Sequence, residues 1–445
     1  MPQLLNDMTP ERARQVFGHP LVDDTYYALP NLITGLRQCR TYEDYYHFQQ
    51  ELLGRVLDVQ EHSRACTRVV LRLGSHKSVP TDAPELRTDT DLNELDTWKL
   101  EVDVCERVGR QLRSIADALA WRVFNYDRQV IVALSRNDPP GPMAGKKGLD
   151  AERKFLTQTW DDEHSFVLLH DLTTCLRIGD GTRFKVVGSG YEAYLHEIKA
   201  DPSRKRSVQS RRKRLAEEAI RDGGPLPNDP DGRLVPLDIP YKTHLNMLRD
   251  AFDKAAIRGV VGMKVPGGRS LVAANLPKGY ELWPEDEFIG RTEKAHEVAC
   301  RRAGILDSSH LIGFRSDDMV GRYATMPPWA IYPLPPAVCA SLITDMAVFI
   351  VTLSSESLLN ALQEVGLTAQ WLLPHDLERL EYGRESIRIH DGVRRTELRS
   401  SELYRLAFEL VDMPTWVQGV KALFARKDLQ GRPWHYFAGE WKVWE

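Results

Sequence analysis

Hydrophobic side chains recur with helical spacing in two stretches near the N-terminus. From Asp44 to Val59, and again over 95–122, apolar residues return every three or four positions. That spacing places them on one face of a helix, so both stretches are predicted to be amphipathic helices. The stretch 80–94 between them is acidic, rich in threonine and interrupted by two prolines, which is typical of a linker.

The pattern becomes mixed between 147 and 220. Leu149–Trp160 keeps helical spacing, and Ser207–Ile220 is predicted to be a basic helix. Strands are predicted from short apolar or alternating runs at Arg128–Leu134, Ser165–Leu169, Thr173–Asp180, Thr182–Val187 and Tyr191–Ala200. Helices combined with short strands indicate an α/β (α+β) fold.

A domain boundary is predicted at 222–240, where Gly-Gly, five prolines and several aspartates occur together. Beyond it the pattern predicts a hairpin over Val260–Ala273, with Pro-Gly-Gly at its turn, and helices near 354–366 and 400–425. We therefore divide the chain into a helical N-terminal region (1–95), an α/β domain (96–222) and a mixed α/β C-terminal domain (241–445).

Composition narrows the functional classes. Lys and Arg number 59 and Asp and Glu 63 in 445 residues, so the net charge is −4, and a globally basic surface for nucleic acid is excluded. The six cysteines are scattered without a CxxC pair, so no zinc finger, zinc ribbon or structural zinc is expected. No apolar run reaches the roughly 18 residues of a membrane span, and no signal-like segment begins the chain. We expect a cytoplasmic protein that does not contact a membrane.

A glutamate two residues before a lysine occurs three times, in different contexts. Glu440 lies five residues from the end, and Glu152 lies in a predicted helix, where positions i and i+2 point in different directions. Glu197 lies in a predicted strand, where Glu197 and Lys199 share a face. Asp180 ends the apolar face of the preceding predicted strand, where a carboxylate must be neutralised, hydrogen-bonded or bound to a cation. Alternatively, Asp180 is the turn residue of an Asp-Gly pair, and Glu197 and Lys199 form an exposed ion pair.

Asp180, Glu197 and Lys199 together resemble the active-site motif of the PD-(D/E)xK nuclease superfamily. The resemblance covers 147–220 and implies a restriction-endonuclease-like mixed sheet flanked by helices. It implies that Asp180 and Glu197 hold Mg²⁺, with Mn²⁺ as an alternative, and that Lys199 orients the attacking water. Gly179 stands where the family has proline, so Asp171 is kept as an alternative to Asp180.

The same resemblance assigns three further residues. Glu152, on the helix before the sheet, and the carbonyl of Ile198 would complete the metal shell. Gln209, on the helix after the sheet, would point back into the active site. For Glu152 the alternative is a side chain at the border of the apolar face, or one paired with Arg153 or with a neighbouring strand.

Seven of the twelve residues from 203 to 214 are basic. On a helix beside a metal site they would contact phosphates, and the alternative is a solvated charged helix. The residues assigned to nucleic-acid binding are Arg204, Lys205, Arg206, Arg211, Arg212 and Lys213.

These observations predict a metal-dependent nuclease that hydrolyses phosphodiester bonds, with DNA as the expected nucleic acid. The resembled family includes bacterial defence and repair nucleases, so a second copy of the chain or a defence-system protein is a candidate partner. One alternative is a catalytically inactive protein with a nuclease fold that binds nucleic acid or assists assembly, and another is a structural α/β protein. Mg²⁺-dependent cleavage separates the nuclease from both, and salt-sensitive binding without cleavage separates the other two.

Overall fold

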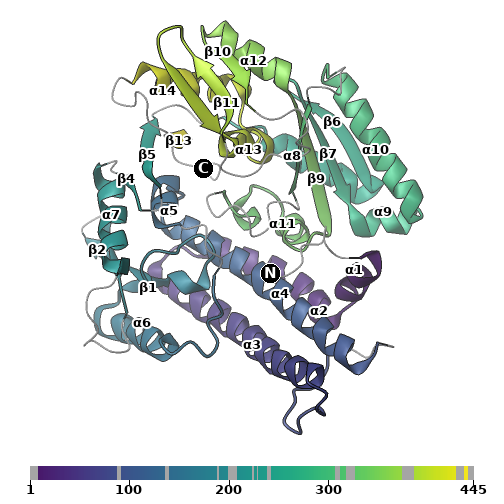
Figure 1. The fold of residues 1–445 in the computed structure, drawn as a ribbon, viewed down its shortest axis with the longest axis vertical. Coiled ribbons are helices and arrows are strands. Elements are labelled where there is room, and N and C mark those ends of the chain that lie inside the picture. The colour runs from purple at the N-terminus through teal and green to yellow at the C-terminus, as the bar shows by residue number, and fades with distance from the viewer. Residues whose placement is uncertain are drawn as a thin grey trace. The chain divides into compact units, whose positions relative to one another are not determined.

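A computed structural model of the chain describes residues 9–87, 92–135, 140–187, 190–198, 208–222, 225–227, 229–237, 242–305, 311–316, 326–372, 385–426 and 435–438. The chain forms two units, each assembled from separate segments of sequence. The first comprises Met1–Phe124, Leu134–Lys213 and Met326–Ile331, and the second comprises Asn125–Ala133, Arg214–Thr325 and Tyr332–Glu445. Both contain helices and sheets (Figure 1), so the α/β class is confirmed in this general form. The predicted division into three domains stays a prediction.

Long helices form the N-terminal part of the first unit. They are α1 (Pro10–Phe17), α2 (Pro20–Gln38), α3 (Tyr42–Gly74) and α4 (Glu94–Val123). α3 begins with a capping box, in which the Asp44 amide donates to Thr41 Oγ1 (3.1 Å) and the Thr41 amide donates to the Asp44 carboxylate (2.8 Å). α3 and α4 pack against each other and bury their apolar faces. Both predicted helices are confirmed, and 80–87 between them forms neither helix nor strand.

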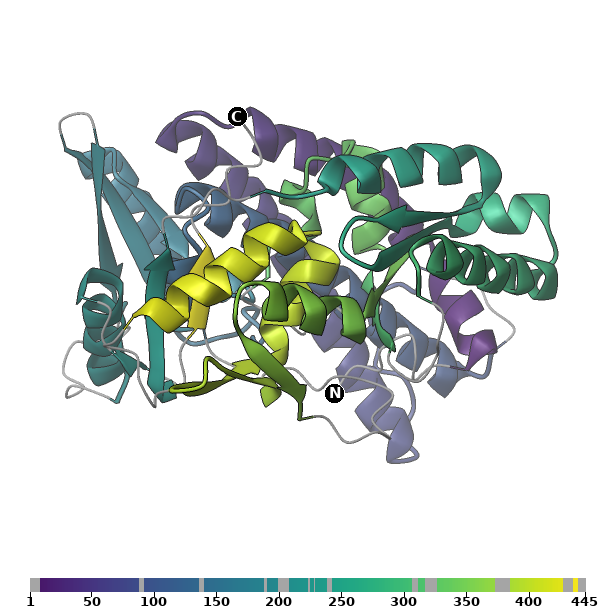
Figure 2. The same cartoon turned by 90° about the horizontal axis from the view of Figure 1, so that it is seen from above.

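The sheet of the first unit is a three-stranded antiparallel meander with the order β1-β2-β3. The elements in chain order are α6 (Leu149–Glu163), β1 (Phe166–Leu169), the 3-10 turn η2 (His170–Leu172), β2 (Gly181–Val187), β3 (Gly190–His196) and α7 (Val208–Asp222). Gly181 at the start of β2 pairs with His196 at the end of β3, and the hairpin can be followed in Figure 2. The residues directly before β2 and directly after β3 therefore meet at one end of the sheet.

The predicted strand Arg128–Leu134 is wrong, because this run forms helix α5 (Arg128–Leu134). Its short apolar pattern fits a strand or a buried helix equally well. The Asp127 carboxylate decides between them, since it accepts from the backbone amides of Gln129 (2.8 Å) and Val130 (3.4 Å). Those amides belong to the first turn of a helix, where they have no partner within the helix.

The predicted strand Thr173–Asp180 is also wrong, because this segment is an irregular loop. The Asp117 carboxylate on α4 accepts from the amides of Thr174 (2.6 Å) and Cys175 (3.0 Å), and the Leu134 carbonyl accepts from the amides of Arg177 (2.8 Å) and Ile178 (3.1 Å). The backbone groups that a strand would offer to a neighbouring strand are therefore used by α4 and by the end of α5.

The second unit is organised around a four-stranded antiparallel sheet with the order β6-β7-β9-β8. The strands are β6 (Val260–Val265), β7 (Arg269–Asn275), β8 (Leu311–Arg315) and β9 (Ala347–Ser354). β6 and β7 form the predicted hairpin, whose turn requires Gly267 and Gly268 at φ of +80° and +65°. Helices α8 (Leu245–Arg258) and α10 (Glu285–Arg302) pack against β6 and β7.

The remaining described elements of the second unit include two more small sheets, with the orders β10-β11-β12 and β13-β5-β4. Their strands are β4 (Pro225–Leu226), β5 (Asp229–Leu237), β10 (Thr368–Trp371), β11 (Glu385–His390), β12 (Arg395–Arg399) and β13 (His435–Ala438). The helices are α9 (Leu276–Leu282), α11 (Pro336–Ile343), α12 (Ser355–Glu364), α13 (Ser400–Phe408) and α14 (Met413–Ala425). The helices predicted near 354–366 and 400–425 are thereby confirmed. None of the described helices combines the length and apolar character needed to cross a membrane.

Candidate active site

Asp180 and Glu197 lie at the open end of the β2–β3 hairpin, directly before β2 and directly after β3. The Asp180 amide donates to the His196 carbonyl (2.8 Å), and the Ile198 amide donates to Asp180 Oδ2 (2.6 Å). The structure therefore brings Asp180 and Glu197 together on neighbouring backbone segments. Asp180 reaches this place from a loop instead of from the end of a strand.

Two more carboxylates and a lysine lie beside this pair. Glu152 comes from the buried face of α6, where it is only 1% exposed, and Asp171 comes from η2. The Lys146 ammonium lies between them, 2.5 Å from Glu152 Oε1 and in contact with Asp171 Oδ2. Glu152 is therefore a buried residue paired with Lys146, and neither lies at the border of the apolar face nor pairs with Arg153.

We refer to Glu152, Asp171, Asp180 and Glu197 as the carboxylate cluster. Burial raises the pKa of Asp180, and the charges of Asp171 and Glu197 raise it further. Burial likewise raises the pKa of Glu152, with additional contributions from Asp171 and Asp180. Burial acts most strongly on Asp171 and would raise its pKa, but the hydrogen bond from Lys146 and the charges of Lys146, Arg177 and Arg113 together lower it. The acidic groups thus repel one another over short distances, and a further cation would relieve that repulsion.

Two buried oxygens of the carboxylate cluster, Glu152 Oε2 and Glu197 Oε1, receive no hydrogen bond from any described residue. The other oxygen of Glu197 accepts from the Ser210 hydroxyl at 3.1 Å. Buried polar atoms nearly always have a hydrogen-bond partner or bind an ion, and carboxylate oxygens are the ligands that hard divalent cations prefer. The chemistry of these donors therefore fits Mg²⁺ or Mn²⁺.

The carboxylate cluster is more open than a closed metal site. Among the described residues, no three members of this cluster bring one oxygen each to within 4.8 Å of the other two, whereas three side chains on α3 and α4 bring their ligand atoms that close. Lys146 holds Glu152 and Asp171 by direct ion pairs, and its side chain is 34% exposed. A metal ion would therefore have to compete with this lysine or bind on the side of Asp180 and Glu197.

Several residues assigned from the sequence lie outside what the structure describes. These are Lys199, Arg204, Lys205, Arg206 and the side chain of Gln209. Ile198 is described, and its amide hydrogen-bonds Asp180, while coordination of a metal by its carbonyl stays a prediction.

The described part of the basic helix α7 has a mixed environment. Arg211 is exposed, whereas Arg212 and Lys213 are partly buried, and Arg214 pairs with Glu218 at 3.5 Å. Ser210 in the first turn contacts Glu197, so α7 begins beside the carboxylate cluster. Phosphate contact by this helix stays a prediction.

Sequence reasoning missed two side chains that reach the carboxylate cluster, Lys146 and Ser210. Lys146 belongs to the short run Gly145-Lys-Lys-Gly148 before α6, and such a glycine-bounded basic run next to a predicted site was a usable signal. Ser210 directly follows Gln209, the residue of this helix that was predicted to reach the site. The predicted helix therefore does lie near the site, but the residue that contacts Glu197 is Ser210.

Two buried residues of α4 hold the loop that carries the site. The Arg113 guanidinium donates to the carbonyl of Asp171 (2.6 Å) and to that of Thr173 (3.3 Å), and Asp117 binds the next two amides of the loop. Burial raises the pKa of Asp117 and lowers that of Arg113 to about 10. Both groups are thus buried in the first unit at a desolvation cost, and they hold the backbone from Asp171 to Cys175.

Comparison of the chain with family models, with curated proteins and with solved structures gives no match.

Proposed function

We propose that the protein is a metal-dependent nuclease whose active site is the carboxylate cluster at the open end of the β2–β3 hairpin. The observation that carries this proposal is a pair of buried carboxylate oxygens, Glu152 Oε2 and Glu197 Oε1, without a hydrogen-bond partner among the described residues. They stand beside Asp180, whose pKa is raised by burial and by its acidic neighbours. Such a group of oxygens is suited to a hard divalent cation.

Asp180, Glu197 and Glu152 would hold the cation, with the Ile198 carbonyl as a further ligand. The bound Mg²⁺ would lower the pKa of a water molecule and offset charge on the phosphate. Ser210 and the Ile198 amide hold Glu197 and Asp180 in place by hydrogen bonds of 3.1 and 2.6 Å. Lys146, and Lys199 as the resemblance implies, supply positive charge near the scissile phosphate. The basic residues of α7 would contact the flanking phosphates.

Cleavage by the purified full-length chain tests this proposal. Single-stranded and duplex DNA, and RNA, are incubated with Mg²⁺ or with a chelator, and products are resolved by size. We expect Mg²⁺-dependent cleavage that falls at least about 100-fold in both variants, because Glu197→Gln removes a charged metal ligand and Lys199→Ala removes positive charge near the scissile phosphate. Lys154→Ala is the matched control, because Lys154 is exposed on α6 and belongs to a chance match of the motif.

Absence of cleavage on every substrate would reject the nuclease proposal, as would full activity of folded Glu197→Gln protein. Folding of each variant is checked by its circular dichroism and melting temperature. Lys154→Ala should retain full cleavage activity. If it lost as much activity as Glu197→Gln, the carboxylate cluster would not be the active site.

One observation favours a second candidate function, that of a catalytically inactive protein with a nuclease-like site that binds nucleic acid. Lys146 already neutralises Glu152 and Asp171 by ion pairs. Its ammonium group thus occupies the position between these carboxylates where a metal ion would otherwise bind. An internal ammonium that replaces a metal ion would leave a stable fold without metal-dependent chemistry.

Lys146→Met separates the two candidates. In the nuclease, the variant removes a competing cation, so Mg²⁺ affinity measured by titration calorimetry should rise by about tenfold, which corresponds to roughly 1.4 kcal/mol. In the inactive protein, wild type binds no Mg²⁺, and the variant loses roughly 3–5 kcal/mol of stability because buried Glu152 is left without its cation, whereas Asp171 keeps Arg177 at 3.5 Å. The neighbouring Lys147→Met is the control for loss of a charge in the same loop.

A further inference from the structure

The long helices α3 and α4 each carry two metal-binding side chains one turn apart. His62 and Cys66 are at positions i and i+4 on α3, and Glu101 and Cys105 are at positions i and i+4 on α4. Residues with this spacing lie on the same face of a helix. Since α3 and α4 pack against each other, the two faces can meet inside the first unit.

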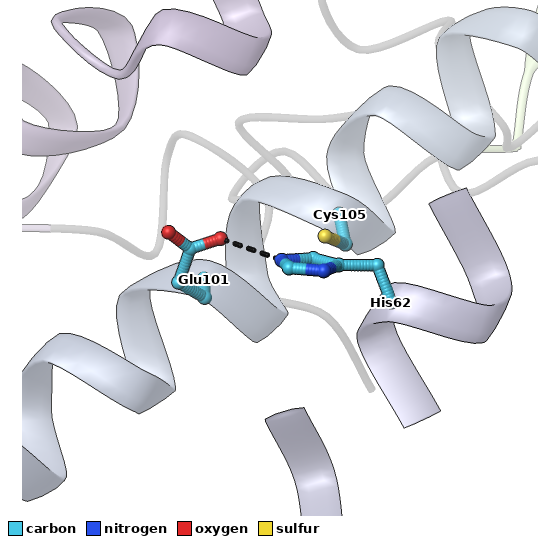
Figure 3. Close-up of side chains that lie close together, drawn as sticks. All are labelled: His62, Glu101 and Cys105. Carbon is cyan, nitrogen blue, oxygen red and sulfur yellow. Dashed lines mark hydrogen bonds and ion pairs between the residues drawn. The ribbon is translucent and has the colours of Figure 1, made fainter. Parts of the chain in front are cut away.

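Three of these side chains do meet. One ligand atom from each of His62, Glu101 and Cys105 lies within 4.8 Å of the other two, and the residues face one another in Figure 3. His62 Nε2 is 3.1 Å from Glu101 Oε2. The side chain of Glu101 is wholly buried, that of His62 is 11% exposed, and Cys105 is buried. A nitrogen, an oxygen and a sulfur ligand thus converge at a protected place.

Cys66 lies close to the same point. It is fully buried, one helical turn beyond His62. Burial raises the pKa of Cys105 to about 12, and after burial the Cys66 sulfur is the largest contributor. Burial followed by the charge of Glu101 raises the pKa of Cys66 to about 12 as well. Cys66 is nevertheless outside the group of three, because its sulfur is more than 4.8 Å from at least one of their ligand atoms. It shares a helix face with His62, and a change of its side-chain rotamer would be needed to make it the fourth ligand.

Glu101 is held in the orientation that a metal ligand needs. Its Oε1 accepts from the Arg87 amide (2.6 Å) and lies 3.2 Å from His19 Nε2. His19 Nδ1 accepts from the Leu21 amide (3.2 Å), so the ring proton of His19 is on Nε2 and points at Glu101. One carboxylate oxygen is thus fixed by two donors, and the other, Oε2, is left facing His62 and Cys105. Groups behind a ligand typically orient it in this way.

The scattered cysteines predicted no structural zinc, but the packing of the two helices changes that expectation: we propose that His62, Cys66, Glu101 and Cys105 bind a zinc ion that joins α3 to α4. Zinc takes four ligands in a tetrahedral arrangement and accepts nitrogen, sulfur and carboxylate oxygen together. Thiolate ligands select zinc over Mg²⁺ and Ca²⁺. Binding releases the two thiol protons to solvent, and it also displaces the proton that His62 Nε2 shares with Glu101, so that this nitrogen offers its lone pair. With four protein ligands the site is closed and has a structural role.

The site is separate from the carboxylate cluster, and neither proposal depends on the other. The zinc ligands come from α3 and α4, and the carboxylate cluster comes from α6, η2 and the β2–β3 hairpin. The Arg87 amide, from the connection between α3 and α4, donates to the same Glu101. Zinc would therefore fasten the two long helices and the connection between them, and its loss should lower stability without being a step in catalysis.

Metal content and cobalt spectroscopy on the full-length chain test the proposal. The chain, purified without chelator, should carry about one zinc per molecule, in line with a single four-ligand site. Replacement by Co²⁺ should produce a thiolate-to-cobalt charge-transfer band together with the intense visible bands of tetrahedral cobalt. Cys105→Ser, Cys66→Ser and His62→Gln should each weaken Zn²⁺ binding by more than about 100-fold. Loss of a residue that only hydrogen-bonds a ligand lowers metal affinity by up to about 100-fold, so a larger loss indicates a direct ligand.

Cys39→Ser is the matched control, because Cys39 is also a buried cysteine of the first unit and its thiol donates to the Gly35 carbonyl (3.3 Å). It should keep zinc and the cobalt spectrum. If a cysteine variant does not fold, alkylation of wild type decides instead: zinc should protect Cys66 and Cys105, and a chelator should abolish the protection. A wild-type chain without zinc affinity, or a cobalt spectrum that survives in both Cys105→Ser and His62→Gln, would overturn the proposal.

Discussion

His170 is wholly buried in the first unit, between β1 and the loop that leads to Asp180. Its Nδ1 lies 2.8 Å from the Ile178 carbonyl, so this nitrogen carries the proton, and Nε2 accepts from the Thr182 hydroxyl at 2.8 Å. Burial lowers the pKa of His170 to about 4, because the charged imidazolium would be desolvated there. The neutral ring thus links the loop to β2 just where Asp180 is placed.

The stability of the protein should depend on this histidine below neutral pH. The folded-state pKa is lower than the unfolded value of 6.5, so the contribution of neutral His170 is fully present above pH 6.5 and is lost as the pH falls toward 4. The loss should amount to about 3 kcal/mol. Chemical denaturation of wild type and His170→Gln at several pH values measures it, and the difference between the two should shrink across that range.

Exposed His47 provides the control for this pH dependence, since its side chain is 68% exposed. The His47→Gln variant should follow the wild-type curve. A difference between wild type and His170→Gln that is constant from pH 7 to pH 4 would show that burial of this ring does not govern the effect.

At the scale of elements, the loop between η2 and β2 is held from outside by α4. Asp117 receives the amides of Thr174 and Cys175 and also contacts the Thr174 hydroxyl. Charged hydrogen bonds of this kind each contribute about 1.5–3 kcal/mol, offset here by the burial that raises the pKa of Asp117. The geometry of Asp180 therefore depends on a helix more than 50 residues earlier in the chain.

Asp117→Ala should lower the free energy of unfolding by about 2–4 kcal/mol, because it leaves buried amides without an acceptor. It should also weaken Mg²⁺ binding, since Asp180 is at the end of the freed loop. Asp150→Ala on the exposed side of α6 is the control and should change stability by less than about 0.5 kcal/mol. Denaturant titration of both variants checks the first expectation, and calorimetry with Mg²⁺ checks the second. Equal stability of the two variants would mean that the loop needs no support from α4.

At the scale of the whole molecule, the two units differ in what they contain. The carboxylate cluster and the α3–α4 ligand cluster both lie in the first unit, whose described sheet is the three-stranded meander. The second unit has the four-stranded sheet and buries charged groups of its own, such as the pair of Arg128 and Glu409 at 2.6 Å. Glu402 beside them has its pKa raised to about 7, mainly by burial. These charges are enclosed among apolar residues and hydrogen-bonded to one another, which is typical of a structural network.

Mg²⁺ should therefore protect the first unit and leave the second unchanged. At a free Mg²⁺ concentration about 100 times the dissociation constant, binding stabilises the segments that must unfold to release the ion by about 2.7 kcal/mol. Hydrogen exchange with and without Mg²⁺ should show slower exchange in 171–180 and in β2 and β3, and no change in β6, β7 and β9. Protection confined to the second unit would place the Mg²⁺ site there.

The sequence by itself determined those features whose cause is local. The amphipathic spacing of α3 and α4, the apolar run of β1 and the Gly267–Gly268 turn depend on residues a few positions apart, so periodicity and turn chemistry predict them. The same is true of Asp180 and Glu197 as neighbours, because they directly precede and follow the two strands of one short hairpin. The general α/β class follows from these elements.

The tertiary structure decided what depends on residues distant in sequence. Asp117 and the Leu134 carbonyl turned a predicted strand into a loop, and Lys146 came to lie between Glu152 and Asp171. Likewise, two cysteines that appear scattered in the sequence, Cys66 and Cys105, come near each other because α3 packs on α4. Hydrophobic spacing predicts which face of an element is buried, but not which charged or metal-binding group on another element will contact it. Those contacts are determined by how the helices pack, because buried polar groups need hydrogen-bond partners.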